Sequence, residues 1–108
     1  MPRVSEARQE PKETVSRAKK PVILTMEATA YTHTGNMTKT ETWPKVGTVA
    51  VDPNVIPLGT KLYVEGYGPA VAEDTGGVIK GMKIDLFMET RLECMKWGRK
   101  EVRVKILE

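Results

Sequence analysis

Val49-Ala-Val-Asp-Pro-Asn-Val-Ile-Pro-Leu-Gly59 and Val71-Ala-Glu-Asp-Thr-Gly-Gly-Val-Ile-Lys-Gly81 follow one pattern, and they lie 22 residues apart. Both begin with Val-Ala-x-Asp, and both end with Gly. The correspondence continues beyond the glycines, where Leu62 aligns with Ile84 and Val64 aligns with Leu86. Repetition of a strand–turn–strand unit predicts a pseudo-symmetric β fold, in which the two units take related positions.

The two copies differ at one position that bears on chemistry, because Tyr63 of the first copy aligns with Asp85 of the second. Side chains alternate between the two faces of a strand. We therefore assign Met82, Ile84, Leu86 and Met88 to the barrel interior, and Lys83, Asp85 and Phe87 to the opposite face. Aspartate is depleted within strands. We interpret Asp85 as a functional carboxylate; the alternative is a solvated charge on the outer face.

Asp52 and Asp74 each stand at the head of a turn, where an aspartate side chain accepts backbone N–H bonds. A purely structural role is therefore an even alternative for both. If the repeated units are related by symmetry, the two turns and Asp85 could gather three carboxylates at one cleft. Neighbouring carboxylates raise the pKa of at least one of them, and a carboxyl that keeps its proton can protonate a leaving oxygen. Cleavage of a glycosidic bond needs such an acid.

Short strands with turn signals between them dominate the rest of the chain, so we expect a mainly β barrel or sandwich in residues 21–108. One short helix is predicted after Thr90, which forms a capping box with Glu93, and Gly98 marks its end. Residues 32–46 read as a long loop that is functional or mobile. Residues 1–20 are polar and charged, and we expect a disordered tail or linker.

Composition excludes several classes of function. Residues 1–20 hold six basic and three acidic side chains, the whole net charge of +3, whereas residues 21–108 are neutral. A neutral folded part argues against nucleic-acid binding, which needs a clustered basic surface. No apolar run is long enough to span a membrane, and we expect no secretory segment, because the printed sequence is charged from Arg3 onward. A single cysteine, Cys94, and a single histidine, His33, argue against a zinc site, and no cofactor is expected.

The stretch VAVDPNVIPLGTKLYVEGYGPAVAEDTGGVIKGMKIDLF resembles the 3D domain, named for three aspartates and found in bacterial cell-wall proteins related to stationary-phase survival and resuscitation-promoting factors. The likeness runs from about Thr29 to Ile106. The same domain is similar to the catalytic barrel of membrane-bound lytic transglycosylase A. The resemblance implies a six-stranded double-psi β-barrel. It also implies cleavage of peptidoglycan between N-acetylmuramic acid and N-acetylglucosamine, leaving a 1,6-anhydro end.

Carried onto this chain, the resemblance implies that Asp85 is the general acid/base and that Asp74 and Asp52 hold and tune it. It also implies a set of glycan-contacting residues, namely Tyr31, Thr75, Gly76, Gly77 and Lys80. For Lys80 a solvated strand-end lysine is an equal alternative. Trp43 lies in the polar loop before Pro44, and we add it as a candidate for stacking on sugar rings.

Three other functions stay open on the sequence. A glycoside hydrolase would use Asp85 as acid and Asp74 or Asp52 to activate water. A glycan-binding barrel would keep the fold without cleaving. A metal site built on the three aspartates is disfavoured, because oxygen-ligand sites usually recruit more ligands. The expected partner is a peptidoglycan glycan strand, the expected state is a monomer, and the resemblance places the protein outside the cell or in the wall.

Overall fold

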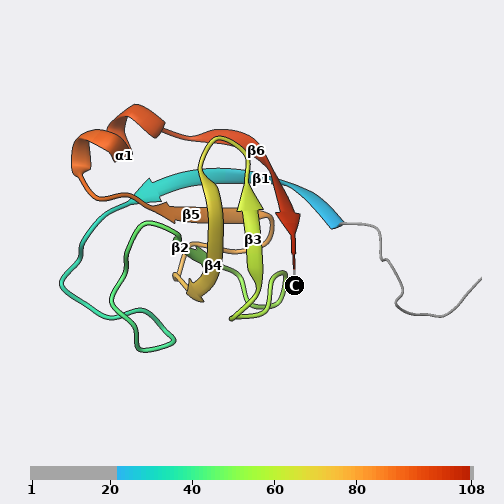
Figure 1. The fold of residues 1–108 in the computed structure, drawn as a ribbon, viewed down its shortest axis with the longest axis horizontal. Coiled ribbons are helices and arrows are strands. Elements are labelled where there is room, and N and C mark those ends of the chain that lie inside the picture. Colours follow the sequence, from blue (N-terminus) through green and yellow to red (C-terminus); the bar gives the residue numbers. More distant parts are fainter. Residues whose placement is uncertain (1–21, 108) are drawn as a thin grey trace, which may run out of the picture.

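A computed structural model describes residues 22–107 of the chain. This part is mainly β, with six strands and one short helix (Figure 1). The elements are β1 (Val22–Tyr31), β2 (Thr48–Val51), β3 (Lys61–Val64), β4 (Gly68–Asp74), β5 (Lys83–Phe87), α1 (Arg91–Trp97) and β6 (Lys100–Ile106). The disordered tail predicted for residues 1–20 lies outside the described residues.

The six strands close into a barrel in the order β1-β5-β2-β4-β3-β6, which confirms the predicted fold class. The two copies of the repeat interlock in this order. Their first strands, β2 and β4, lie side by side and parallel. The second strand of each copy pairs antiparallel with the first strand of the other copy, β3 with β4 and β5 with β2. Both edges of each copy's first strand are therefore covered by strands of the other copy.

The predicted local structure is largely confirmed. The helix begins after Thr90, whose side chain accepts a bond from the Glu93 N–H while the Glu93 side chain accepts one from the Thr90 N–H. Gly98 ends it with a positive φ of 69°, a conformation that glycine adopts without strain. The assignment of Met82 to the interior is wrong, because this residue precedes β5 and is 44% exposed.

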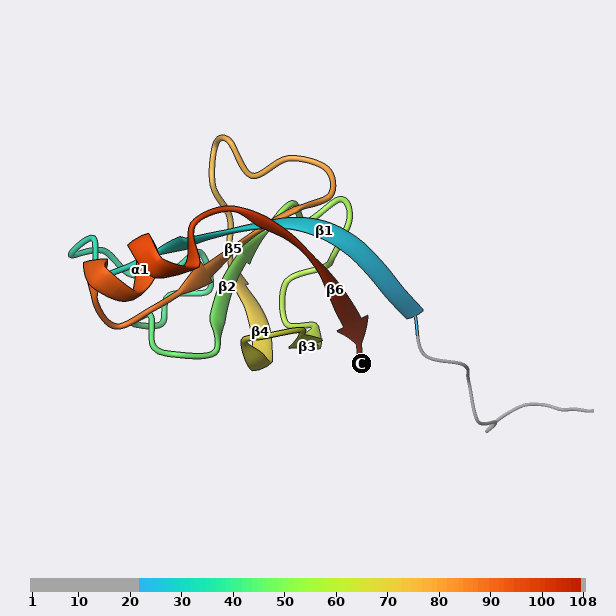
Figure 2. The same cartoon turned by 90° about the horizontal axis from the view of Figure 1, so that it is seen from above.

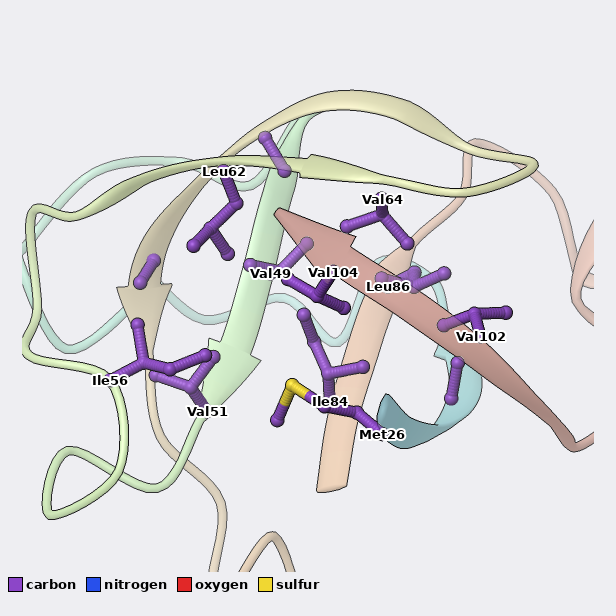
Figure 3. Packing of buried hydrophobic residues seen from close by; sticks show 13 residues of the cluster. Met26, Val49, Val51, Ile56, Leu62, Val64, Ile84, Leu86, Val102 and Val104 are labelled. Atoms are coloured by element: carbon purple, nitrogen blue, oxygen red, sulfur yellow. The ribbon is translucent and has the colours of Figure 1, made fainter. Parts of the chain in front are cut away.

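One hydrophobic cluster fills the barrel (Figure 3). It draws on all six strands and on the loop that follows β2. Leu62, Val64, Ile84 and Leu86, the positions that the repeat pairs, are fully buried in it. Because strand side chains alternate, their neighbours Tyr63 and Asp85 point outward. Both copies of the repeat thus supply buried apolar residues at matching positions, whereas their outward-facing residues differ.

Loop 32–47 and α1 lie at the same end of the barrel, where β1 finishes (Figure 2). The loop is anchored to β4, because the Thr40 and Thr42 hydroxyls donate to one oxygen of Glu73 at 3.2 and 2.6 Å, and the Thr40 N–H donates to the Glu73 carbonyl. The loop that the sequence predicted to be functional or mobile is therefore docked on β4 by these three hydrogen bonds. No helix within residues 22–107 is long and apolar enough to cross a membrane.

Candidate functional site

A row of four residues crosses the outer face of the barrel. Thr29 on β1 is opposite Asp85 on β5, Asp85 is opposite Ala50 on β2, and Ala50 is opposite Asp74 on β4. Neighbouring strands lie about 4.8 Å apart, so the Cα atoms of the two aspartates are about 10 Å apart with Ala50 between them. Ala50, which is buried, contributes only a methyl group between the two carboxylates.

A register irregularity places Asp74 in this row. Val49 is opposite Ala72, but the next residue of β2, Ala50, is opposite Asp74. Glu73 is therefore an extra residue on β4, as in a β-bulge, which redirects the side chains that follow it. Without the bulge, Glu73 would face Ala50 and Asp74 would lie one position further along.

Asp85 is partly buried, and its Oδ1 accepts a hydrogen bond of 3.0 Å from the Thr29 hydroxyl. Burial raises the pKa of Asp85 above the ordinary aspartate value; the Thr29 bond opposes this, and the negative charge of Asp74 adds to it. Desolvation disfavours the charged form of an acid, and a nearby like charge does the same. Asp85 thus holds a proton to higher pH than an exposed aspartate, as a general acid must.

Asp74 ties three segments together. Its Oδ1 accepts N–H bonds from Lys39 at 3.0 Å and from Thr75 at 2.9 Å. The first bond closes loop 32–47 against the end of β4, and the second shapes the turn that follows the strand. Asp74 therefore serves both as a turn residue, which is the structural alternative, and as a negative charge that acts on Asp85.

Asp52 has a different environment. It is buried, its Oδ1 accepts the Asn54 N–H at 3.0 Å, and its Oδ2 accepts the Gly81 N–H at 2.9 Å. These two bonds lower the pKa of Asp52, the one from Gly81 most strongly. The carboxylate joins the turn of the first copy to the last glycine of the second. The structure thus brings Asp74 and Asp85 together around Ala50 and engages Asp52 in holding two loops.

Tyr31 follows Thr29 on the same face of β1, and its ring meets the edge of Phe87 with centroids 5.6 Å apart. Its hydroxyl is buried without a hydrogen-bond partner among the described residues. Burial, followed by the charges of Asp74 and Asp85, raises the pKa of Tyr31. A buried hydroxyl without a partner costs about 1–3 kcal/mol, so a ligand oxygen that reached it would gain a strong contact.

The other predicted glycan-contacting residues are dispersed. Thr75 and Gly76 are half-buried beside Asp74, whereas Gly77 and Lys80 are exposed further along the same loop. Trp43 is 62% exposed in loop 32–47. Thr75 lies beside the aspartate pair, because its N–H donates to Asp74. The positive charge of Lys80 instead helps to lower the pKa of Asp52.

Sequence reasoning missed Thr29 and Glu73. Thr29 holds Asp85, yet β1 and β5 are parallel and 56 residues separate the two partners, so no local pattern links them. Glu73 is the extra residue of the bulge and the anchor of loop 32–47. The one available signal was the Glu in Val-Ala-Glu-Asp, where the first copy has Val51.

Among the described residues, no group of three or more histidine, cysteine, aspartate or glutamate side chains lies close enough to hold a metal ion. The chemistry that the site itself offers is proton transfer. Asp85, whose pKa is raised, and a second carboxylate, Asp74, lie in one outward-facing row with Ala50 between them.

Comparison with known proteins identifies the family. The 3D domain family matches residues 47–108, more than half of the chain, and the chain belongs to this family. The cell wall-binding protein YocH of Bacillus subtilis (strain 168) is 52% identical over 92 residues, which are 78% of this chain and 32% of that protein. YabE of the same strain, whose name refers to cell wall shaping, is 46% identical over 93 residues, which are 79% of this chain and 23% of YabE.

The fold has counterparts among solved structures. The barrel superimposes on MltA from Escherichia coli, described as a lytic transglycosylase fold, with a TM-score of 0.56 and 26% sequence identity. The match covers 68% of this chain and 27% of MltA. The chain therefore spans about a quarter to a third of the length of the proteins compared here.

Proposed function

We propose that this barrel is a peptidoglycan lytic transglycosylase that works at the cell wall, with Asp85 as its single general acid/base. The observation that carries the proposal is the placement of Asp85 and Asp74 on either side of Ala50, where burial and then the charge of Asp74 raise the pKa of Asp85. The family membership, the barrel shared with MltA and the wall-related names of the relatives support the substrate.

The proposed reaction uses one carboxyl group twice, first as an acid and then as a base. Asp85 gives its proton to the glycosidic oxygen as the bond from that oxygen to C1 of N-acetylmuramic acid breaks. The Asp85 carboxylate then takes the proton of the C6 hydroxyl of the same sugar, whose oxygen closes on C1. The products are a free 4-hydroxyl and a 1,6-anhydro end, and no water is consumed.

Within this proposal the neighbours of Asp85 have supporting roles. Thr29 fixes the carboxyl by its 3.0 Å bond, and the charge of Asp74 adds to burial in raising the pKa of Asp85. The unpartnered hydroxyl of Tyr31 is suited to bind a sugar oxygen. Thr75 and Gly76 border Asp74, where the glycan would continue along the row.

Digestion of purified peptidoglycan tests the proposal. Wild-type protein should release fragments with 1,6-anhydro ends, lighter by one water than the products of hydrolysis, and Asp85→Asn should release them about 10²–10⁴-fold more slowly. Muropeptide mass spectrometry reads both results. Products with reducing ends would instead favour a hydrolase in which Asp74 activates water.

A glycan-binding barrel without activity is the second candidate, and the observation that favours it is the name of YocH as a cell wall-binding protein. For that candidate, wild type and Asp85→Asn should bind insoluble peptidoglycan equally, and neither should release any fragment.

A further inference from the structure

A groove lies on the side of the barrel opposite Asp85. In the closed order β1-β5-β2-β4-β3-β6, strand β3 is three places from β5 in either direction. The groove has a volume of about 390 Å³. It is lined by Ile23, Tyr63, Glu65, Gly66, Arg103 and Lys105, and we call it the Tyr63 groove.

Strand register explains why these side chains meet. Lys105 on β6 is opposite Ile23 on β1 and opposite Tyr63 on β3, so the three form one row. Their neighbours Val64 and Val104 point into the core (Figure 3). The row therefore faces outward, with an apolar side chain at each end and a lysine between them.

The groove presents an aromatic ring on a rigid support. Tyr63 is 50% exposed and Ile23 is 54% exposed, so a large apolar surface is open to solvent there. Beside it, both oxygens of Glu65 are engaged by Arg103, one by its N–H at 3.0 Å and one by its guanidinium at 3.1 Å. These bonds, that from the N–H first, lower the pKa of Glu65 and hold the ion pair in place.

The polar groups of the groove leave a surplus of hydrogen-bond donors. Glu65 spends both oxygens on Arg103, and a guanidinium has more N–H groups than this pairing uses. Lys105 adds an ammonium group, so the lining holds two cations and one carboxylate. A half-exposed aromatic side chain beside such donors suits a pyranose ring, which has an apolar C–H face and hydroxyls at its rim. The surplus positive charge complements a strand that carries acidic peptides.

We propose that the Tyr63 groove is a second, non-catalytic binding site for a peptidoglycan strand. A sugar ring lies on Tyr63, and Arg103 and Lys105 contact its hydroxyls or the acidic peptides attached to it. The identity of this ligand rests on the proposed function, but the binding itself does not involve Asp85. Because the two sites lie on opposite sides of the barrel, one molecule can hold one strand while it engages a neighbouring strand at Asp85.

Binding to insoluble peptidoglycan tests this site, with Asp85→Asn as the parent so that the wall is not digested during the measurement. Adding Tyr63→Ala should weaken binding about tenfold, as loss of an aromatic anchor commonly does. Adding Tyr63→Phe should leave binding unchanged, since the ring face remains. Leu92→Ala, which removes a 60% exposed apolar side chain from α1, is the matched control and should bind as the parent does.

Three results would overturn the inference: undiminished binding by Tyr63→Ala, an equal loss for Leu92→Ala, or a dimer in light scattering that Tyr63→Ala dissociates, which would make the groove a contact between two copies. Thermal unfolding confirms that each variant is folded. Cleavage of short soluble glycan fragments by Tyr63→Ala should match wild type. If wild type cleaves nothing but binding depends on Tyr63, the proposed function fails and this site stands. If wild type cleaves peptidoglycan but binding does not depend on Tyr63, only this site is removed.

Discussion

The two copies of the repeated unit, residues 49–64 and 71–86, build the same interior and different exteriors. Each places two apolar residues of its second strand in the core, Leu62 and Val64 in one copy and Ile84 and Leu86 in the other. Between them stands an exposed tyrosine in the first copy and a partly buried aspartate in the second. Both copies of the pattern therefore contribute the same kind of residue to the core, whereas their outward-facing positions carry side chains of different chemistry.

The leading aspartates of the two copies differ in how they use their oxygens. Asp52 accepts one N–H on each oxygen, whereas Asp74 accepts both of its N–H bonds on Oδ1. Only Asp74 stands in the row with Asp85, because the bulge at Glu73 brings Asp74 opposite Ala50, whereas Asp52 lies two residues after Ala50. The same turn motif therefore acts as a structural clasp in one place and as part of a proton-holding pair in the other.

The sharpest test of this division compares Asp85→Asn with Tyr63→Asn, the aligned position in the first copy. Removal of a general acid typically lowers the rate by about 10²–10⁴-fold. We expect Asp85→Asn to lose cleavage of peptidoglycan to that extent, while Tyr63→Asn keeps its activity on short soluble fragments. Release of anhydro-muropeptides over time measures both. Comparable losses in the two variants would remove the distinction between the copies.

Asp74→Asn should shift the pH dependence of cleavage. The charge of Asp74 helps to raise the pKa of Asp85, so its removal lowers that pKa toward the ordinary value. The alkaline limb of the rate profile should then move to lower pH, and the rate near neutrality should fall by about tenfold at most. Initial rates measured from acid to neutral pH show this. A uniform loss at every pH would mean that Asp74 acts by a route other than its charge.

The turns that follow the two aspartates can be compared through their glycines. Gly76 aligns with Asn54 of the first copy, and a Cβ on it would come within 2.9 Å of the Ile79 side chain, which is buried. Gly77 has nothing within 4 Å of the same added atom. We expect Gly76→Ala to lower the free energy of unfolding by about 1–3 kcal/mol, as overpacking does, and Gly77→Ala to change it little. Denaturant titration of both variants measures the difference.

Amide substitution of the two leading aspartates should separate them by stability. Asparagine has one acceptor oxygen, so Asp52→Asn must turn an NH₂ group toward the N–H of Asn54 or Gly81. Asp74→Asn can still accept both of its bonds on one oxygen. We therefore expect Asp52→Asn to have the lower Tm of the two. A scan that found Asp74→Asn the less stable variant would contradict this account.

Part of this molecule could be predicted from its sequence, and the reasons are physical. The helix cap at Thr90 and the alternation around Asp85 depend on residues a few positions apart. The cap was confirmed, and the alternation was confirmed for Ile84 and Leu86 but was wrong for Met82. The bond from Thr29 to Asp85 joins strands that are distant in sequence, and the bulge at Glu73 depends on parallel pairing with β2. Neither leaves a periodic pattern, so the sequence could nominate three aspartates without showing which two would share a row.

The smallest expected effect concerns Asp85 itself. Because its pKa is raised in the folded protein, the stability gained from holding the proton is present below the ordinary value of 3.8 and is lost as pH rises through the folded value. Asp85→Asn has no such proton to lose, so it should be slightly more stable than wild type at neutral pH, and the gap should shrink in acid.

Asp52, whose pKa is lowered, has the opposite sign: it stabilises above 3.8, and this contribution fades as pH falls through its folded value. Tm measured against pH for wild type, Asp85→Asn and Asp52→Asn should therefore give differences of opposite sign at neutral pH. If Asp85→Asn is the less stable protein there, its carboxylate is well solvated in the folded state, and the case for a protonated acid is lost.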